Sequence, residues 1–317
     1  MHFRRWVRSS VSVFATSAVA LIAVGFASPS VAFASSTQSV SHAVPVASPT
    51  TTFPWKGHDP SCKVRLLIPG VVSYGRFTTC PPKRVLVLGD SVALTMGIQM
   101  ALGQEDWGTI VDDAALIGCG FVIGYDVKFE GVLAHLNPAC DNEAAVWTSD
   151  VRSFEPQAIV VEMGWWDSYR HMINGKLSFL TQLQYDSLVE NRILGLIHTL
   201  RAVSAAPIDF LSVPWMQPPA LPNGQPEPAA SAASHNEINS LIQSATKSST
   251  TTQFVDISPY ITPAGQFQAD VGGGICRMSD GVHLYDSSGT TNYVHTECGK
   301  ALQGGILSMI RQDLMKK

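Results

Sequence analysis

Short apolar runs alternate with helix-compatible segments along most of the chain from Arg84 onward. The runs that predict strands are bounded by Gly, Pro or polar residues; they cover 85–88, 109–112, 158–163, 208–213 and 254–257. Helices are expected over 92–102, near 143–154, and over 180–203, 230–246 and 299–315. Strands separated by helices favour a parallel sheet covered on both faces. The pattern therefore predicts an α/β domain over residues 83–317, with three layers, α/β/α, around a central parallel sheet.

The first 34 residues have the features of an export signal. Arginines come first, an uncharged apolar stretch follows over residues 11–26, and Ala32-Phe33-Ala34 has the small-x-small pattern of a cleavage site. We expect a secreted, extracytoplasmic protein that is cleaved after Ala34. The apolar stretch is slightly long for a signal, so an uncleaved membrane anchor is the alternative.

Two segments separate this signal from the α/β domain. Residues 35–54 are rich in Ser, Thr and Pro and lack Asp, Glu, Lys and Arg, which predicts a disordered linker. Residues 55–82 contain two cysteines and scattered apolar residues. We expect them to form a disulfide-stapled N-terminal extension that packs on the main domain.

The cysteine count is even in a chain expected to be exported, which favours disulfides over metal thiolates. The six are Cys62, Cys80, Cys119, Cys140, Cys276 and Cys298. No CxxC pair is present, so no metal site is predicted. The connectivity is open among fifteen possibilities. Local pairing of 62 with 80, 119 with 140 and 276 with 298 would close loops of about 20 residues, each stabilising the fold by roughly 3 kcal/mol.

The formal net charge is -4 and no basic run is present, so nucleic acid is not expected as a partner. The glycine run at 272–274 lacks a following Lys and a helix start, so it does not predict a phosphate-binding loop. No cofactor is expected. The oligomeric state is left open.

Ser91 lies at the expected turn from the first strand to the first helix, because Gly89 ends the apolar run before it. At this position the free N–H groups of the first helical turn point toward negative charge that develops at the serine oxygen. The turn is therefore a favourable place for a nucleophile. The alternative is that Asp90 or Ser91 only caps the helix.

Three further segments complete a candidate active site, since such sites lie beyond the carboxyl ends of parallel strands. One loop contains Gly118, where a backbone without a side chain can approach a ligand closely. Another reads Gly164-Trp165-Trp166-Asp167. Near the C-terminus, Asp280 and His283 are three residues apart. Asp280 could therefore orient the His283 ring while the other ring nitrogen faces the serine.

These motifs resemble those of the SGNH (GDSL-type) hydrolase superfamily, which acts on acyl esters. Gly89-Asp90-Ser91 matches its GDS block, and Asp280 and His283 match its DxxH block. Gly118 matches the family glycine, with Asp113 where Asn is common. The resemblance covers roughly residues 83–312. It implies a flavodoxin-like fold and a catalytic triad in which Ser91 is the nucleophile, His283 the base and Asp280 its partner.

One block departs from the family pattern. Trp166 stands where the G-x-N-D block has an Asn that donates to the oxyanion, and loss of such a donor costs on the order of 3 kcal/mol. A G-x-W-D/E form is similar to SGNH domains associated with polysaccharide O-acyltransferases. The resemblance implies an oxyanion hole from the N–H groups of Ser91 and Gly118, with the Trp166 indole as a candidate third donor. Trp166, Asp167 and Tyr285 are the candidates for contact with the substrate.

Several other residues near these motifs have two interpretations. Trp215 and Tyr285 are candidates for a platform under a sugar ring. His171 is interpreted as an exposed loop histidine, with a place in the pocket as the alternative. Trp165 is expected to pack in the interior, and Glu162 to be buried and paired in a strand.

The expected function is that of a secreted, serine-dependent ester hydrolase or O-acyltransferase that acts on O-acyl groups of cell-envelope polysaccharide. The substrate partner would be an acylated carbohydrate or a small ester. A transferase would also need an acyl donor outside the cytoplasm, which predicts a separate membrane protein as a partner. The alternative is a non-catalytic glycan-binding module on the same fold, because Trp166 replaces the oxyanion Asn.

Overall fold

The computed structural model describes residues 83–107, 109–262, 264–269 and 277–284. Several expectations from the sequence lie outside the described residues. These are the signal over 1–34, the linker over 35–54, the extension over 55–82, the helix over 299–315, Tyr285, and the cysteines at 62, 80, 276 and 298.

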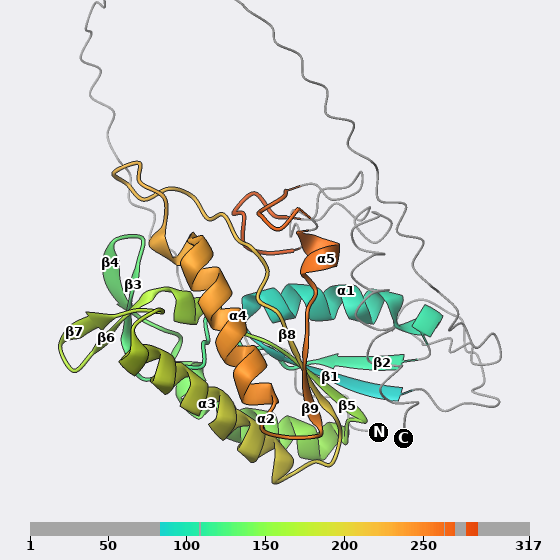
Figure 1. Ribbon diagram of the computed structural model, residues 1–317. Coiled ribbons are helices and arrows are strands. Elements are labelled where there is room, and N and C mark those ends of the chain that lie inside the picture. Colours follow the sequence, from blue (N-terminus) through green and yellow to red (C-terminus); the bar gives the residue numbers. More distant parts are fainter. Residues whose placement is uncertain (1–82, 108, 263, 270–276, 285–317) are drawn as a thin grey trace, which may run out of the picture. The chain divides into compact units, whose positions relative to one another are not determined.

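A five-stranded parallel sheet lies at the centre of the described part (Figure 1). Its strands are β1 (Lys83–Gly89), β2 (Thr109–Asp113), β5 (Ala158–Glu162), β8 (Ile208–Leu211) and β9 (Thr252–Val255). Their spatial order is β2-β1-β5-β8-β9. Renumbered along the chain, this is 2-1-3-4-5, the order of flavodoxin-like doubly wound sheets. The predicted fold class is confirmed.

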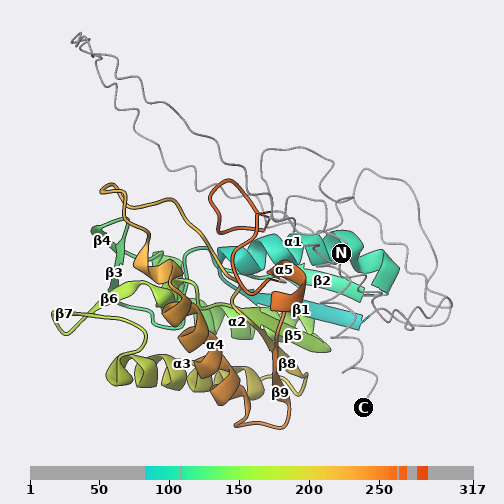
Figure 2. The ribbon, with the colours of Figure 1, turned by 45° about the horizontal axis from the view of Figure 1, so that its top comes forward.

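Helices cover both faces of this sheet. They are α1 (Ser91–Trp107), α2 (Glu143–Phe154), α3 (Leu183–Arg201), α4 (Ala232–Thr246) and the short α5 (Ser258–Ile261). Helix α1 runs along one face over β1 and β2, and α2, α3 and α4 lie against the opposite face (Figures 1 and 2). The three predicted layers are therefore present. Helix α1 extends further than the expected 92–102, and α3 is shorter than the expected 180–203.

The core lies where the two helical layers meet the sheet. Val85 to Leu88 in β1 and Ala158 to Val161 in β5 are at most 1% exposed, because strands at the centre of a parallel sheet are covered on both faces. Helix α3 presents an apolar stripe at helical spacing. Its buried residues are Tyr185, Val189, Ile193, Leu196, Ile197 and Leu200.

A second, antiparallel sheet was not predicted. It contains β3 (Asp126–Phe129), β4 (Val132–His135), β6 (Arg170–Ile173) and β7 (Lys176–Ser178), in the order β4-β3-β6-β7. Each half is a hairpin whose two turn residues have positive φ: Glu130 and Gly131 in one, Asn174 and Gly175 in the other. An Asn-Gly pair between two strand-forming runs is a strong hairpin signal, so the second hairpin could have been predicted.

Short 3-10 helices connect these elements: η1 (Pro138–Asn142), η2 (Trp166–Ser168) and η3 (Pro228–Ala230). Cys119, in the loop after β2, forms a disulfide with Cys140 in η1. The expected local pairing is thus confirmed for these two cysteines. Across the described ranges, no helix combines the length and the apolar character that a bilayer crossing requires.

Candidate active site

Ser91 is the first residue of α1 and follows the end of β1 after one intervening residue. That residue, Asp90, caps the helix: its Oδ1 accepts a hydrogen bond from the Val92 N–H at 2.7 Å, and its carbonyl accepts from the Leu94 N–H at 3.0 Å. Gly89 has a φ of +138°, and a Cβ there would overlap the Glu162 carbonyl. The sharp turn therefore requires glycine. Because Asp90 makes the capping hydrogen bond, the cap does not use the Ser91 side chain.

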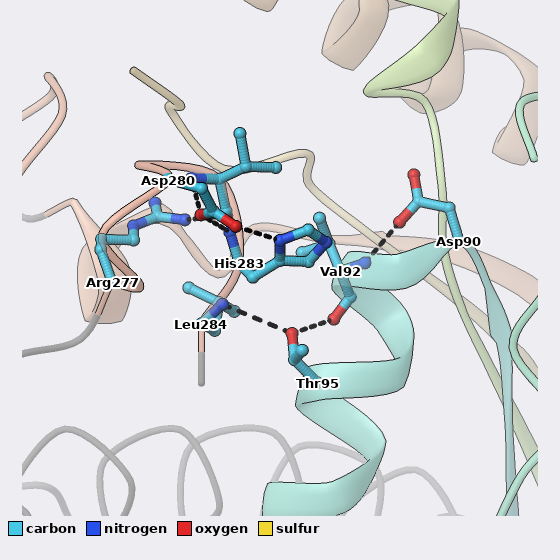
Figure 3. Close-up of polar contacts among 8 residues, drawn as sticks. Asp90, Val92, Thr95, Arg277, Asp280, His283 and Leu284 are labelled. Carbon is cyan, nitrogen blue, oxygen red and sulfur yellow. Dashed lines mark hydrogen bonds and ion pairs between the residues drawn. The ribbon is translucent and has the colours of Figure 1, made fainter. Parts of the chain in front are cut away.

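Asp280 and His283 form a hydrogen-bonded pair (Figure 3). The ring Nδ1 of His283 lies 2.6 Å from Asp280 Oδ2. The other carboxylate oxygen accepts from the N–H groups of Val282 at 2.8 Å and His283 at 3.0 Å. Burial raises the pKa of Asp280, but these hydrogen bonds outweigh it, so the pKa lies below its ordinary value. An ionised Asp280 favours a proton on Nδ1, which leaves Nε2 of His283 able to accept another.

The segment that carries this pair is attached to α1. The Leu284 N–H donates to Thr95 Oγ1 at 3.4 Å, and Thr95 Oγ1 itself donates to the Val92 carbonyl at 2.8 Å. Thr95 follows Ser91 by four residues, so both lie on one face of the helix. Figure 3 shows the His283 ring beside the first turn of α1. The structure therefore brings the Asp280–His283 pair to the helix face that carries Ser91.

The loop after β2 lies at the same end of the sheet. The Leu116 N–H donates to the Gly89 carbonyl at 2.8 Å, which joins this loop to the turn before Ser91. Gly118 is buried and has a φ of +82°. Asn137 Nδ2 donates to the Ile117 carbonyl at 2.8 Å, and the Cys119–Cys140 disulfide also ties the loop to this segment. The Gly118 backbone is thus fixed in a loop anchored beside the Ser91 turn.

Asp167 ties the loop after β5 to the loop after β2. Its side chain is fully buried, and its two oxygens accept from the N–H groups of Phe121 and Val122, each at 2.8 Å. Burial raises the pKa of Asp167 to about 6, while the two amide hydrogen bonds act in the opposite direction. A Cβ at Gly120 would lie 2.9 Å from the carboxylate. Asp167 therefore holds the two loops together through its buried carboxylate, and its expected contact with substrate stays a prediction.

The two tryptophans of this loop differ in their surroundings. Trp165 is 5% exposed and meets the Tyr169 ring edge to face at 5.3 Å, which confirms the packing interpretation. Trp166 lies 5.4 Å from the Phe129 ring and 5.5 Å from the Tyr169 ring. Its indole Nε1 is buried and has no hydrogen-bond partner in the described part of the chain. Burying an N–H without a hydrogen-bond partner lowers the stability of the folded state. The same N–H could donate to a bound substrate.

Two fully buried carboxyl groups lie beneath the Ser91 turn. Burial raises the pKa of Asp90 to about 7. Burial, and then the charge of Asp90, raise the pKa of Glu162 well above its ordinary value, while the positive charge of Arg277 acts in the opposite direction. Glu162 also accepts the Asp90 N–H at its backbone carbonyl, at 3.2 Å. The expected burial of Glu162 is confirmed, and the group beside it is a second acid.

The expectation that His171 is an exposed loop histidine is wrong. His171 is fully buried in β6, and its Nδ1 lies 2.7 Å from the Tyr185 hydroxyl and 3.1 Å from the Tyr169 carbonyl. Burial lowers its pKa to about 4. Tyr185 in turn donates to the Asp167 carbonyl at 3.1 Å. The error follows from the unpredicted hairpin, because a histidine placed in a loop is expected to meet solvent.

Two residues that organise the site were missed. Thr95 joins α1 to the His283 segment, and Arg277 holds the backbone of that segment. Arg277 is 3% exposed and donates to the carbonyls of Val282 at 3.1 Å and Trp215 at 2.6 Å. No sequence pattern marks either residue, because each contacts a backbone group more than 60 positions away in the chain. Among the described residues, no group of three His, Cys, Asp or Glu side chains could hold a metal ion.

No protein-family model and no curated protein matches this chain. Solved structures similar to it include the periplasmic domain of a lipopolysaccharide acetyltransferase from Salmonella ser. Paratyphi A, with a TM-score of 0.44 and 11% identity over 74% of this chain and 84% of that one. Another is a GDSL-like lipase from Bacteroides thetaiotaomicron, with a TM-score of 0.42 and 15% identity over 74% and 88%. A third is an acetylxylan esterase from Geobacillus stearothermophilus, solved as a catalytic mutant, with a TM-score of 0.39 and 12% identity over 72% and 94%.

Proposed function

We propose that this chain is a serine-dependent acyl esterase or O-acyltransferase of the SGNH class, with Ser91, His283 and Asp280 as its catalytic triad. One observation carries the proposal. The Asp280–His283 pair, joined at 2.6 Å, sits on a segment that Leu284 and Thr95 attach to the helix beginning at Ser91. Nucleophile, base and orienting acid are the three parts that acyl transfer through serine requires.

In the first half of the reaction, Ser91 Oγ bonds to the carbonyl carbon of an ester while its proton passes to Nε2 of His283. Asp280 stabilises the imidazolium that results. The protonated His283 then gives this proton to the leaving alkoxide oxygen as the carbon–oxygen bond breaks. An acyl group remains on Ser91, and the alcohol departs.

In the second half, an acceptor hydroxyl replaces the alcohol. Water, or a hydroxyl group of a sugar, loses its proton to His283 and attacks the acyl carbon. The bond to Ser91 breaks, and the serine oxygen recovers the proton from His283. Water gives hydrolysis and a sugar hydroxyl gives transfer, so the same residues support both outcomes.

The charge on the carbonyl oxygen is stabilised by backbone N–H groups of Ser91 and Gly118 in this proposal. Ser91 begins α1, where the first N–H groups have no partner within the helix and the helix dipole also favours negative charge. Trp166 is the candidate for the third donor. Its support is the buried Nε1 that has no partner in the described part of the chain. A replacement donor would offset the loss of about 3 kcal/mol that follows from the missing Asn.

We infer that the enzyme works outside the cytoplasm on O-acyl groups of cell-envelope polysaccharide. Residues 1–34 have the pattern of an export signal, and the Cys119–Cys140 disulfide fits an oxidising compartment. Hydrolysis is the first expectation. Transfer would require an acyl donor on a separate membrane protein, and a pull-down with the purified domain would recover that partner.

Hydrolysis of p-nitrophenyl acetate tests the triad directly. Replacing Ser91 by Ala should lower kcat by at least about 1,000-fold, because no other group in the triad can form the acyl intermediate. Ser153→Ala is the matched control, since the Ser153 hydroxyl is exposed in α2 and only donates to the Asp150 carbonyl. Both variants should keep the wild-type circular dichroism spectrum. Wild-type-like turnover by the Ser91→Ala variant would falsify the proposal.

A non-catalytic glycan-binding module is the second candidate, because Trp166 occupies the position of the oxyanion Asn. A fluorophosphonate probe separates the two functions, since it labels only an activated serine. Labelling that disappears in Ser91→Ala supports the enzyme. A folded wild-type protein that is not labelled supports the binding module.

A further inference from the structure

A groove of about 470 Å³ lies beside the catalytic segment and takes no part in the mechanism above. Residues of the long loop after β8 form most of it, and two residues near position 266 complete it. Its polar and aromatic lining includes Trp215, Gln217, Glu227, Gln266 and Phe267. The volume falls within the range of small-molecule sites, about 300–1,000 Å³.

The wall of this groove is joined to the segment of Asp280 and His283. Arg277 connects the two, because it donates to the Trp215 carbonyl at 2.6 Å and to the Val282 carbonyl at 3.1 Å. The Gln217 N–H also donates to the Gly281 carbonyl at 2.9 Å. A Cβ at Gly281 would overlap the Gln217 carbonyl, so the two backbones are in close contact. A ligand in the groove would therefore lie next to the loop that carries the proposed base.

Trp215 is the one aromatic side chain in the described lining that is stacked on a second ring. Its indole is stacked on the His235 imidazole, with centroids 4.1 Å apart and an angle of 20° between the planes. His235 is held in turn from α4, where its Nε2 lies 3.2 Å from Asn239 Nδ2. A ring fixed in this way loses little conformational freedom when a ligand packs on it.

The chemistry of the lining selects among ligands. No lysine or arginine is among the described residues that line the groove, and Glu227 adds a carboxylate, so the lining disfavours an anionic ligand. The exposed side-chain amides of Gln217 and Gln266 would be desolvated without compensation by an acyl chain. A pyranose ring has an apolar face of C–H groups and a rim of hydroxyls. That combination matches an aromatic plane with amide and carboxylate groups beside it.

We propose that this groove binds a pyranose unit of the carbohydrate that carries or receives the acyl group, with Trp215 as the stacking platform. The inference rests on the proposed function, since it names the substrate class of the same site. It differs from the triad assignment in that binding in the groove needs no chemistry at Ser91.

Calorimetric titration with xylohexaose, a neutral chain of pyranoses, tests the groove in Ser91→Ala protein. Adding Trp215→Ala should weaken binding about tenfold or more, while Trp215→Phe, which keeps an aromatic plane, should retain part of the affinity. Gln217→Ala should weaken binding by about threefold through the loss of one neutral hydrogen bond. Gln184→Ala, at an exposed position of α3, is the matched control and should leave the affinity unchanged.

Equal affinity with and without the Trp215 indole would overturn the inference, as would the absence of saturable binding to Ser91→Ala protein. If Trp215→Ala does not fold, the Trp215→Phe and Gln217→Ala variants decide the matter in the same way. Failure of the proposed function would be recognised separately. It would appear as wild-type protein that lacks Ser91-dependent turnover of p-nitrophenyl acetate, whatever the outcome of the titration.

Discussion

The backbone N–H of Leu284 donates to the hydroxyl of Thr95 across 3.4 Å, between positions 189 residues apart in the chain. Each partner is close in sequence to a member of the proposed triad: His283 precedes Leu284, and Ser91 lies one helical turn before Thr95. This contact therefore attaches the segment of His283 to the helix that begins at Ser91.

Replacing Thr95 by Val keeps the shape of the side chain and removes the acceptor for the Leu284 N–H. We expect kcat/KM for p-nitrophenyl acetate to fall about tenfold, the rate equivalent of roughly 1.4 kcal/mol, because the His283 segment is held less firmly. Thr148→Val is the control, since Thr148 makes the same local bond to a carbonyl in α2, at 3.1 Å, but no long-range one. Equal loss in both variants would mean that the contact does not position the base.

Replacing Asp280 by Asn should lower kcat by about 1,000- to 10,000-fold, because an amide favours the wrong proton position on the ring and does not stabilise the imidazolium. Asp126→Asn is the control. That carboxylate also lies beside a histidine, His135, at 3.1 Å, but on the exposed face of the second sheet. Steady-state kinetics should show no change for it. A variant of Asp280 that keeps most of its activity would contradict the role assigned here.

Replacing Asp167 by Asn should reduce the free energy of unfolding by about 2–3 kcal/mol, measured by urea denaturation. One amide oxygen replaces two carboxylate oxygens, so either Phe121 or Val122 loses its buried acceptor. Asp186→Asn should cost less than about 1 kcal/mol, since this partly exposed carboxylate accepts from a single amide, that of Thr181. A mild effect at Asp167 would show that the two loops are held together by other contacts.

The buried acids beneath Ser91 predict that stability falls as the pH rises. The pKa of Asp90 is raised to about 7 and that of Glu162 well above its ordinary value, both chiefly by burial. The folded state then keeps protons that the unfolded chain releases. The stabilisation is fully present below the ordinary pKa of a carboxyl group. It is lost as the pH rises through the raised pKa values of Asp90 and Glu162, and each carboxyl lowers the free energy of unfolding by up to about 1.4 kcal/mol per pH unit.

Unfolding in urea at pH 5, 6, 7 and 8 measures this slope. Glu162→Gln should flatten it, because the amide has nearly the same shape and no charge to bury. Glu155→Gln is the control, since this exposed side chain only lies 3.6 Å from Arg84 at the surface, and its slope should equal that of the wild type. A wild-type protein that is more stable at pH 8 than at pH 5 would contradict the prediction.

Features that depend on neighbours along the chain could be predicted from the sequence. The apolar runs at 85–88 and 158–163 indicated central strands, because buried parallel strands are apolar on both faces. The spacing of Asp280 and His283 indicated a paired acid and base, because residues three apart meet within one turn of backbone. The hairpin at Asn174 and Gly175 belongs with these local features and was missed, which in turn misplaced His171 at the surface.

The sequence by itself determined the parallel sheet, the strand-to-helix turn at Ser91 and the Asp280–His283 pair, since periodicity and short spacing act locally. Only the tertiary structure decided what the polar side chains bind. The partners of Asp167, Phe121 and Val122, lie about 45 residues away in the sequence. Thr95 accepts a hydrogen bond from Leu284, 189 residues further along the chain. A buried oxygen accepts from whichever backbone N–H the fold brings within reach, and that choice leaves no pattern along the chain.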